Sequence, residues 1–216
     1  MDPIRHEGPS RSPGSDTDVS AHIEPGVADD AATLVFEGPA IPDTLATFTG
    51  VLTLHGLDIA SATIVRTGER VRDTFRLHVH PGGMPGEAEI AQLAAQASSA
   101  IAGVYDLAAE MDRRRVVPCS PDDAAHVQAI GPDAEVTRFI VSATDRPGLL
   151  YDLAAALSRH GMRTRSISVV TSGRTAIDTF EVVGHDSMPL ADPAEISRVR
   201  DALLAAAQGY VPPENE

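Results

Sequence analysis

The sequence predicts an α+β protein built from two copies of one unit, with antiparallel strands in sheets and helices on one face. Three observations lead to this fold class. From Ala32 onward the chain reappears later at a constant shift that carries Pro42 onto Pro147. Within each copy, apolar spacing changes between strand-like alternation and helical periodicity. The 216 residues and 43% apolar content are enough for two ordinary domains, each with a core.

The two copies share identical residues of several chemical kinds at equivalent positions. Identical residues pair along both copies: Leu45 with Leu150, Leu52 with Leu157, His55-Gly56 with His160-Gly161, Ser61 with Ser166, Gly68 with Gly173, and Asp73-Thr74-Phe75 with Asp178-Thr179-Phe180. One residue further along, Ala88-Glu89-Ile90 meets Ala194-Glu195-Ile196. A match of this length predicts a duplicated domain.

Each copy opens with an apolar strand, at residues 34–36 and 139–141, and continues into a first helix at 43–55 and 148–160. The second of these helices is amphipathic, because four apolar residues share one face: Leu150, Leu153, Ala154 and Leu157. A glycine follows each helix where a C-terminal cap is expected, at Gly56 and Gly161.

A second strand, a tight turn and a third strand follow the first helix. The second strands span residues 57–66 and 162–171, and the turns fall at Thr67-Gly68 and Ser172-Gly173. Second helices are indicated by helically spaced apolar residues, at Ile90, Leu93, Ala94 and Ala97 and at Ile196, Val199 and Leu203. The first of them extends or restarts through Leu107 and Met111 to three arginines, which suit a helix C-terminus better than a phosphate site.

This order is most of a ferredoxin-like βαββαβ unit. Little chain remains after the last helix for a fourth strand, but a short alternating segment precedes each copy, at residues 21–23 and 125–130. We therefore expect a permuted unit, in which the preceding segment pairs with the first strand and fills the fourth-strand position. The domains are expected at 19–115 and 123–211, joined by a linker at 116–122 and preceded by a disordered tail at 1–18.

Bulk properties exclude several classes of function. The net charge of −14 argues against nucleic-acid binding, which depends on clustered Lys and Arg. No apolar run is long enough to cross a membrane, and no signal peptide is apparent. The single cysteine, Cys119, allows no internal disulfide and suits the cytoplasm.

The stretch from Asp145 to Leu150 is the candidate site. A strand feeds a short loop into a helix N-terminus, where backbone N–H groups can hold an anion, and Gly148 leaves room for close approach. The alternative is an ordinary strand-to-helix connection.

These residues resemble the ACT domain family, whose members are small ferredoxin-like regulatory modules that bind amino acids and pair side by side. The likeness rests on Asp145-Arg146-Pro147-Gly148-Leu149-Leu150, on His160-Gly161-Met162 and on Asp178-Thr179-Phe180. The tandem arrangement over residues 20–210 most resembles the C-terminal ACT pair of the bifunctional uridylyltransferase/uridylyl-removing enzymes that modify the nitrogen regulator PII. The nucleotidyltransferase and hydrolase domains of that group have no room in this chain.

The resemblance implies a ligand site at the loop before the first helix of the second copy. Backbone amides of Gly148, Leu149 and Leu150 would hold a carboxylate, beside Pro147. Asp145 would accept from the ligand ammonium or simply cap the helix, and Arg146 would pair with the carboxylate or be a surface charge. Ser166 and Ser168 would line the pocket or be ordinary surface serines.

The first copy departs from this pattern, since Ala40, Ile41 and Asp43 replace Asp145, Arg146 and Gly148. Asp43 is expected to cap its helix and to fill the place of a ligand carboxylate, so this copy would serve as a structural partner.

No catalytic constellation, metal site or cofactor site is predicted. Cys119 has no His or Asp at motif spacing, His78 and His80 form an incomplete pair, and His185-Asp186 is expected in a solvated loop. We expect a non-catalytic cytoplasmic regulator of nitrogen metabolism that binds an amino acid, glutamine first. Its further partner would be a second copy or a regulated protein, with neither nucleic acid nor membrane involved. The alternatives are an interaction module without a ligand and a regulatory fragment of a nucleotidyltransferase of PII signalling.

Overall fold

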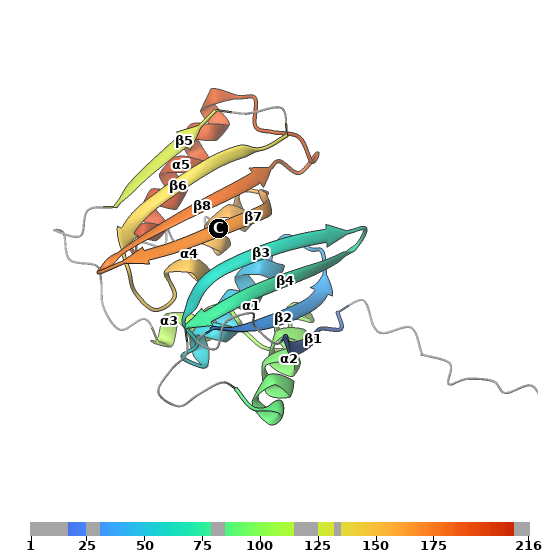
Figure 1. Cartoon of the computed structure of the whole chain (residues 1–216). Coiled ribbons are helices and arrows are strands. Elements are labelled where there is room, and N and C mark those ends of the chain that lie inside the picture. Colours follow the sequence, from blue (N-terminus) through green and yellow to red (C-terminus); the bar gives the residue numbers. More distant parts are fainter. Residues whose placement is uncertain (1–16, 25–30, 79–84, 115–124, 132–134, 210–216) are drawn as a thin grey trace, which may run out of the picture.

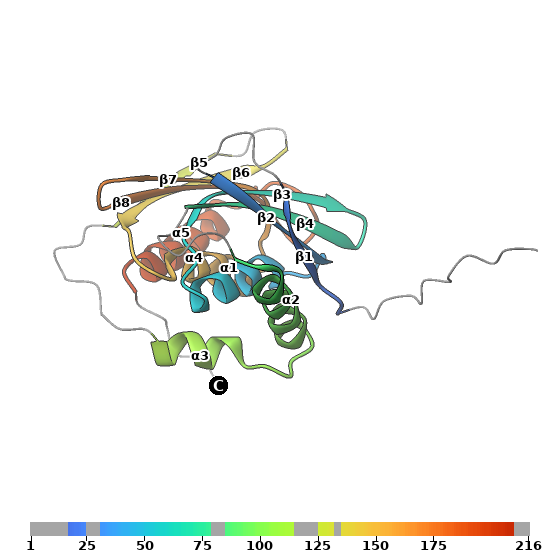
Figure 2. The ribbon, with the colours of Figure 1, turned by 60° about the horizontal axis from the view of Figure 1, so that its bottom comes forward.

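The computed structural model describes residues 17–24, 31–78, 85–114, 125–131 and 135–209. In these residues, the strands form one antiparallel sheet, and the helices cover one of its faces (Figures 1 and 2). The first copy contains β1 (Ser20–Glu24), β2 (Ala31–Pro39), α1 (Thr44–Leu54), β3 (Ile59–Thr67), β4 (Arg70–His78), α2 (Glu87–Ile101) and α3 (Leu107–Arg114). The second contains β5 (His126–Ile130), β6 (Thr137–Thr144), α4 (Leu149–Arg159), β7 (Arg163–Ser172), β8 (Thr175–Val183) and α5 (Pro193–Ala207).

The fold class expected from the sequence is confirmed, with the two expected sheets joined into one of eight strands in the order β1-β2-β4-β3-β7-β8-β6-β5. The permuted strands are present in both copies, because β1 pairs with β2 and β5 pairs with β6. The expected linker at 116–122 and Cys119 lie outside the described residues, as does all of the expected tail but its last two residues.

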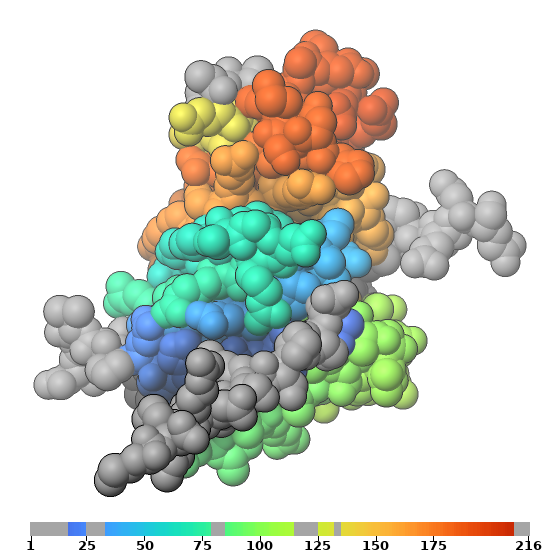
Figure 3. Space-filling view, turned by 90° about the vertical axis from the view of Figure 1, so that its right-hand side faces the viewer, coloured from blue at the N-terminus to red at the C-terminus, as the bar shows by residue number. Residues whose placement is uncertain are grey.

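The two copies meet along one junction. Strands β3 and β7 pair edge to edge, with Ala62 opposite Ile167, and α1 lies against α4 beneath them. In the space-filling view, teal residues of the first copy pack directly against orange residues of the second (Figure 3). The hydroxyl of Ser158, near the end of α4, donates a hydrogen bond to the Asp43 carboxylate, just before α1.

Both first helices end in the same way, as the glycines predicted. Gly56 and Gly161 adopt φ of +68° and +71°. The Leu57 N–H donates to the Leu52 carbonyl at 3.0 Å, and the Met162 N–H donates to the Leu157 carbonyl at 2.9 Å. These bonds satisfy carbonyls that the helix itself leaves unpaired, and they turn the chain into the following strand.

The core lies between the sheet and the helices. In the first copy, Phe36 stacks on Phe48 with ring centroids 4.7 Å apart and meets Phe75 edge to face at 6.1 Å. In the second copy, Phe139 and Phe180 are fully buried. They lie on β6 and β8, the strands equivalent to those of Phe36 and Phe75. The second helix of the first copy restarts as α3. Arg114, at the end of α3, donates to the Leu54 carbonyl at the end of α1 at 2.6 Å, so it acts at the C-terminus of a neighbouring helix and not only at its own, where it was predicted.

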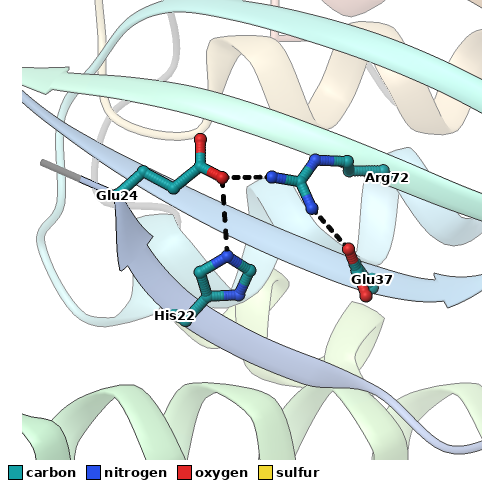
Figure 4. Close-up of polar contacts among 4 residues, drawn as sticks. All are labelled: His22, Glu24, Glu37 and Arg72. Atoms are coloured by element: carbon teal, nitrogen blue, oxygen red, sulfur yellow. Dashed lines mark hydrogen bonds and ion pairs between the residues drawn. The ribbon is translucent and has the colours of Figure 1, made fainter. Parts of the chain in front are cut away.

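Strand β1 is held to the sheet by an ion-pair cluster on the face away from the helices. Arg72 of β4 reaches across β2 and pairs with Glu24 of β1 and Glu37 of β2, and His22 lies 3.7 Å from Glu24 (Figure 4). These side chains are 38–47% exposed, so each pair contributes little by itself. The cluster serves mainly to join three strands.

The junction depends on the missing side chain of Gly50. A Cβ at this position of α1 would lie 2.8 Å from Tyr151 Cδ2 and 3.0 Å from Leu107 Cδ2. We expect Gly50→Ala to lower the free energy of unfolding in urea by about 1–2 kcal/mol, because overpacking outweighs the gain of about 1 kcal/mol in helix propensity. In a Tyr151→Ala background the same change should cost clearly less, and equal costs in both backgrounds would contradict this reading.

Candidate functional site

The loop after β6 is fixed to the hairpin between β7 and β8. The Asp145 N–H donates to the Arg174 carbonyl at 2.8 Å, and the Leu149 N–H donates to the Arg146 carbonyl at 3.2 Å. Gly148 precedes α4 with φ of +81°, a conformation that suits glycine. Within the part of the chain that the structure describes, the amides of Gly148 and Leu150 make no hydrogen bond. They remain free to bind an acceptor.

This loop borders a cavity of about 380 Å³ between the two copies. All six loop residues from Asp145 to Leu150 line it. The second copy adds Val169, Thr171, Ala176 and Asp178, and the first copy adds Thr53, Gly56, Leu57, Asp58 and Ile59. The volume is within the range of small-molecule sites, and both copies are needed to form the walls.

Three carboxylates give the cavity a negative character. Asp178 is 2% exposed, and its Oδ1 has no hydrogen-bond partner among the described residues. Burial raises the pKa of Asp178 to about 7, and the charge of Asp145 contributes in the same direction. The pKa of Asp145 is raised by burial and by Asp58, against the opposing effects of the Arg146 backbone N–H and His78. A cationic group in the cavity would relieve this repulsion.

Arg146 does not offset these charges, although it lines the cavity. Its Nη2 donates to Asp152 Oδ2 at 2.6 Å and to the Ala206 carbonyl at 2.9 Å. The side chains of Arg146 and Asp152 are 17% and 5% exposed, so this ion pair is largely buried. The sequence left two roles open for Arg146, and this burial excludes the role of an exposed surface charge. It joins the start of α4 to the last turn of α5, and its Nε has no partner in the described residues.

A family model for the ACT domain matches residues 137–198. Strands β6, β7 and β8, helix α4 and the loop at the cavity all fall within this range. Residues 137–198 form an ACT domain. The domain type and the relatives below support a regulatory role for the chain.

Similarity to known proteins extends beyond the ACT domain into the first copy. The chain is 28% identical over 180 residues to the bifunctional uridylyltransferase/uridylyl-removing enzyme of Rhodospirillum rubrum, covering 79% of this chain and 19% of that enzyme. The enzyme of the same name from Streptomyces coelicolor is 30% identical over 174 residues, covering 70% and 20%. The chain thus spans about a fifth of the length of these relatives.

Among solved structures, aspartate kinase from Synechocystis is similar with a TM-score of 0.44 and 15% identity, covering 81% of this chain and 26% of that chain. A likeness at this level adds nothing to the fold described above.

Ser166 and Ser168 do not line the ACT-domain cavity. They lie on the face of β7 opposite to Ile167 and Val169, and the cavity opens on the latter face. The Ser166 hydroxyl instead donates to Glu181 Oε2 at 2.8 Å. The alternation of apolar residues along β7 already indicated this separation.

Sequence reasoning missed Asp178 and Asp58 as site residues. Asp178 belongs to the repeated Asp-Thr-Phe stretch, and its spacing of two from Phe180 places both side chains on the core face. That spacing was the available signal. Asp58 comes from the other copy, and only the pairing of β3 with β7 brings it near.

Asp43 in the first copy does not act as predicted. It stands immediately before α1, but its carboxylate makes no hydrogen bond to the helix amides. It accepts from Ser158 of α4 instead, so it joins the copies and does not imitate a ligand carboxylate. Within the described residues, no group of three or more His, Cys, Asp or Glu side chains could hold a metal ion, and no helix has the length and apolar character to cross a membrane.

The raised pKa of Asp178 makes stability depend on pH. Well below pH 4 the carboxyl is neutral in both folded and unfolded chains. Between about pH 4 and 7 it ionises in the unfolded chain but keeps its proton in the folded one, so folding must take up a proton and stability falls as pH rises. Relative to the wild type, Asp178→Asn should therefore gain stability between pH 4 and 8, by up to about 4 kcal/mol. Urea unfolding at both pH values measures this, with Asp201→Asn, an exposed aspartate on α5, as control. A difference that does not change with pH would contradict the assignment.

Proposed function

We propose that the chain is a non-catalytic regulatory protein whose ACT domain binds a free amino acid in the cavity between the two copies. The observation that carries this proposal is the composition of the cavity. It combines unpaired amides at the start of α4 with the carboxylates of Asp58, Asp145 and Asp178. An α-carboxylate and an α-ammonium group require these two kinds of partner.

The ligand would contact both copies at once. Gly148 and Leu150 belong to the second copy, whereas Thr53, Asp58 and Ile59 belong to the first. A ligand that binds one arrangement of the copies more tightly than another shifts the population toward it, and a partner protein or a second copy of the chain could respond to that shift. This is how we propose that binding is signalled.

Glutamine is the first candidate among amino acids. The similarity to uridylyltransferase/uridylyl-removing enzymes supports this choice and a place in nitrogen regulation. We propose that this chain has a regulatory role in the cytoplasm and carries neither of the two activities in the relatives' name. It would act as a whole regulator or as the regulatory part of a longer enzyme.

A second candidate is a protein interaction module, which is favoured by the sheet face that no helix of the described residues covers. Val170 and Ile177 lie opposite each other on β7 and β8 and are 55% and 39% exposed, and Val65 of β3 is 51% exposed. Apolar side chains on an open sheet face suit a protein partner.

Calorimetric titration of the full chain with each of the twenty amino acids separates these functions. We expect saturable binding of one or two amino acids, weakened about 10- to 100-fold by Asp145→Asn, because a hydrogen bond to a charged group contributes about 1.5–3 kcal/mol. Asp201→Asn should bind as the wild type does. Absence of binding by all twenty would favour the interaction module. Gly148 is a poor target, because φ of +81° and the nearby Met111 Cε strain any replacement.

Ligand affinity should also rise with pH. With a pKa of about 7, Asp178 is largely protonated at pH 6 and cannot then attract an ammonium group as a carboxylate. The dissociation constant should fall several-fold between pH 6 and 8 in the wild type, and Asp178→Asn should remove most of this change. An affinity independent of pH in the wild type would exclude Asp178 as the partner of the ammonium group.

A further inference from the structure

A second cavity lies at the other end of the junction. It has a volume of about 950 Å³ and is related to the first by the internal repeat. The loop Pro39–Ile41 of the first copy takes the place of the loop that begins the ACT-domain site. The end of β3 and the start of β7 replace the end of β7 and the start of β3. The duplication has thus produced two cavities, each walled by both copies.

The second cavity is basic where the first is acidic. Four arginines line it, namely Arg66 and Arg70 from the first copy and Arg163 and Arg165 from the second. In the shift that relates the copies, Arg163 takes the place of Asp58 and Arg66 the place of Thr171. In a chain with a net charge of −14, such a convergence of positive charge is unusual.

These arginines are not paired with carboxylates. None of the four forms a salt bridge within the described residues. Arg66 donates to the Ala40 carbonyl at 3.0 Å, and Arg70 donates to the Asp18 carbonyl at 3.1 Å. Arg163 contacts the Ser187 hydroxyl at 3.2 Å and His185 Nδ1 at 3.3 Å. These partners are carbonyl groups, a hydroxyl group and an imidazole ring, and none of them is a carboxylate.

Arg66 shows the electrostatic consequence. Its Nε is buried and has no hydrogen-bond partner among the described residues. Burial lowers the pKa of the Arg66 guanidinium, and the charges of Arg163 and Arg165 lower it further, against the opposing effect of Asp73. Glu69 is the carboxylate that lines this cavity among the described residues, and it is exposed, whereas the buried Asp73, which acts on Arg66, does not line the cavity. An anion in the cavity would supply the missing charge.

We propose that this second cavity is a binding site for a small molecule that carries a phosphate or pyrophosphate group. Planar guanidinium groups bind phosphate oxygens with paired hydrogen bonds, and Arg163 and Arg165 present such groups from one strand. The apolar side chains of Ile41, Ile64 and Val183 also line the cavity and provide a surface for the rest of the molecule. The site is separate from the proposed amino-acid site and does not depend on it.

Titration of the full chain with pyrophosphate and with inorganic phosphate tests the proposal, with ionic strength held constant by sodium chloride. We expect saturable binding of pyrophosphate at one site per chain and weaker binding of phosphate. Arg165→Gln should weaken binding about tenfold, and Arg163→Gln with Arg165→Gln should abolish it at accessible concentrations. Arg165 makes no hydrogen bond or ion pair in the described structure, so its replacement leaves the fold intact.

The matched control is Arg200→Gln, an exposed arginine on α5 that pairs with Asp201. This variant should bind pyrophosphate as the wild type does. Absence of saturable binding would overturn the proposal, and so would binding that Arg200→Gln weakens as much as Arg165→Gln does. Thermal unfolding with and without pyrophosphate gives a second readout, since a ligand that binds only the folded chain raises its melting temperature.

Discussion

The pairing of β3 with β7 is the constraint on which the rest of the structure depends. It makes one sheet of two four-stranded units, and it brings α1 against α4, where Gly50 leaves space for the ring of Tyr151. Both cavities lie at the ends of this junction, and neither has complete walls within one copy. A single copy would supply only part of the walls of either cavity, with Asp58 in one and Arg66 in the other from the first copy. The duplication therefore creates the sites as well as the fold.

The repeat also explains why the two cavities can differ. Because the two copies share one fold, each cavity is lined by equivalent backbone segments: the loop before a first helix, the end of one strand and the start of another. Their side chains are free to diverge, and they have done so in charge: Asp58 and Asp145 at one end, Arg66, Arg163 and Arg165 at the other. At one pair of equivalent positions, Asp58 and Arg163, the charge is reversed outright, as two ligands of different character would require. The fold alone does not require this reversal of charge between the two cavities.

The elements were predictable because local signals and tertiary packing agree. Alternating apolar residues indicated the strands, Gly56 and Gly161 indicated the helix ends, and the short alternating segments ahead of each copy indicated the permuted strands. The loop from Asp145 to Leu150 was predictable from its position before a helix. Ser166 and Ser168 were misplaced because their side chains point away from the face marked by Ile167 and Val169. Asp58 and the basic cavity could not be predicted, because no local pattern shows which strand edges of the two copies meet.

The buried aspartates of the third strands bear most directly on function. Asp73 and Asp178 occupy core-facing positions where an apolar residue would pack at lower cost, and burial raises the pKa of each to about 7. Asp73 has the charge of Arg66 beside it. Asp178 has no such neighbour, since the charge that acts on it is the negative charge of Asp145. The two carboxyl groups are otherwise equivalent by the repeat, so the counter-charge absent at Asp178 is the one that the ammonium group of a bound amino acid would provide.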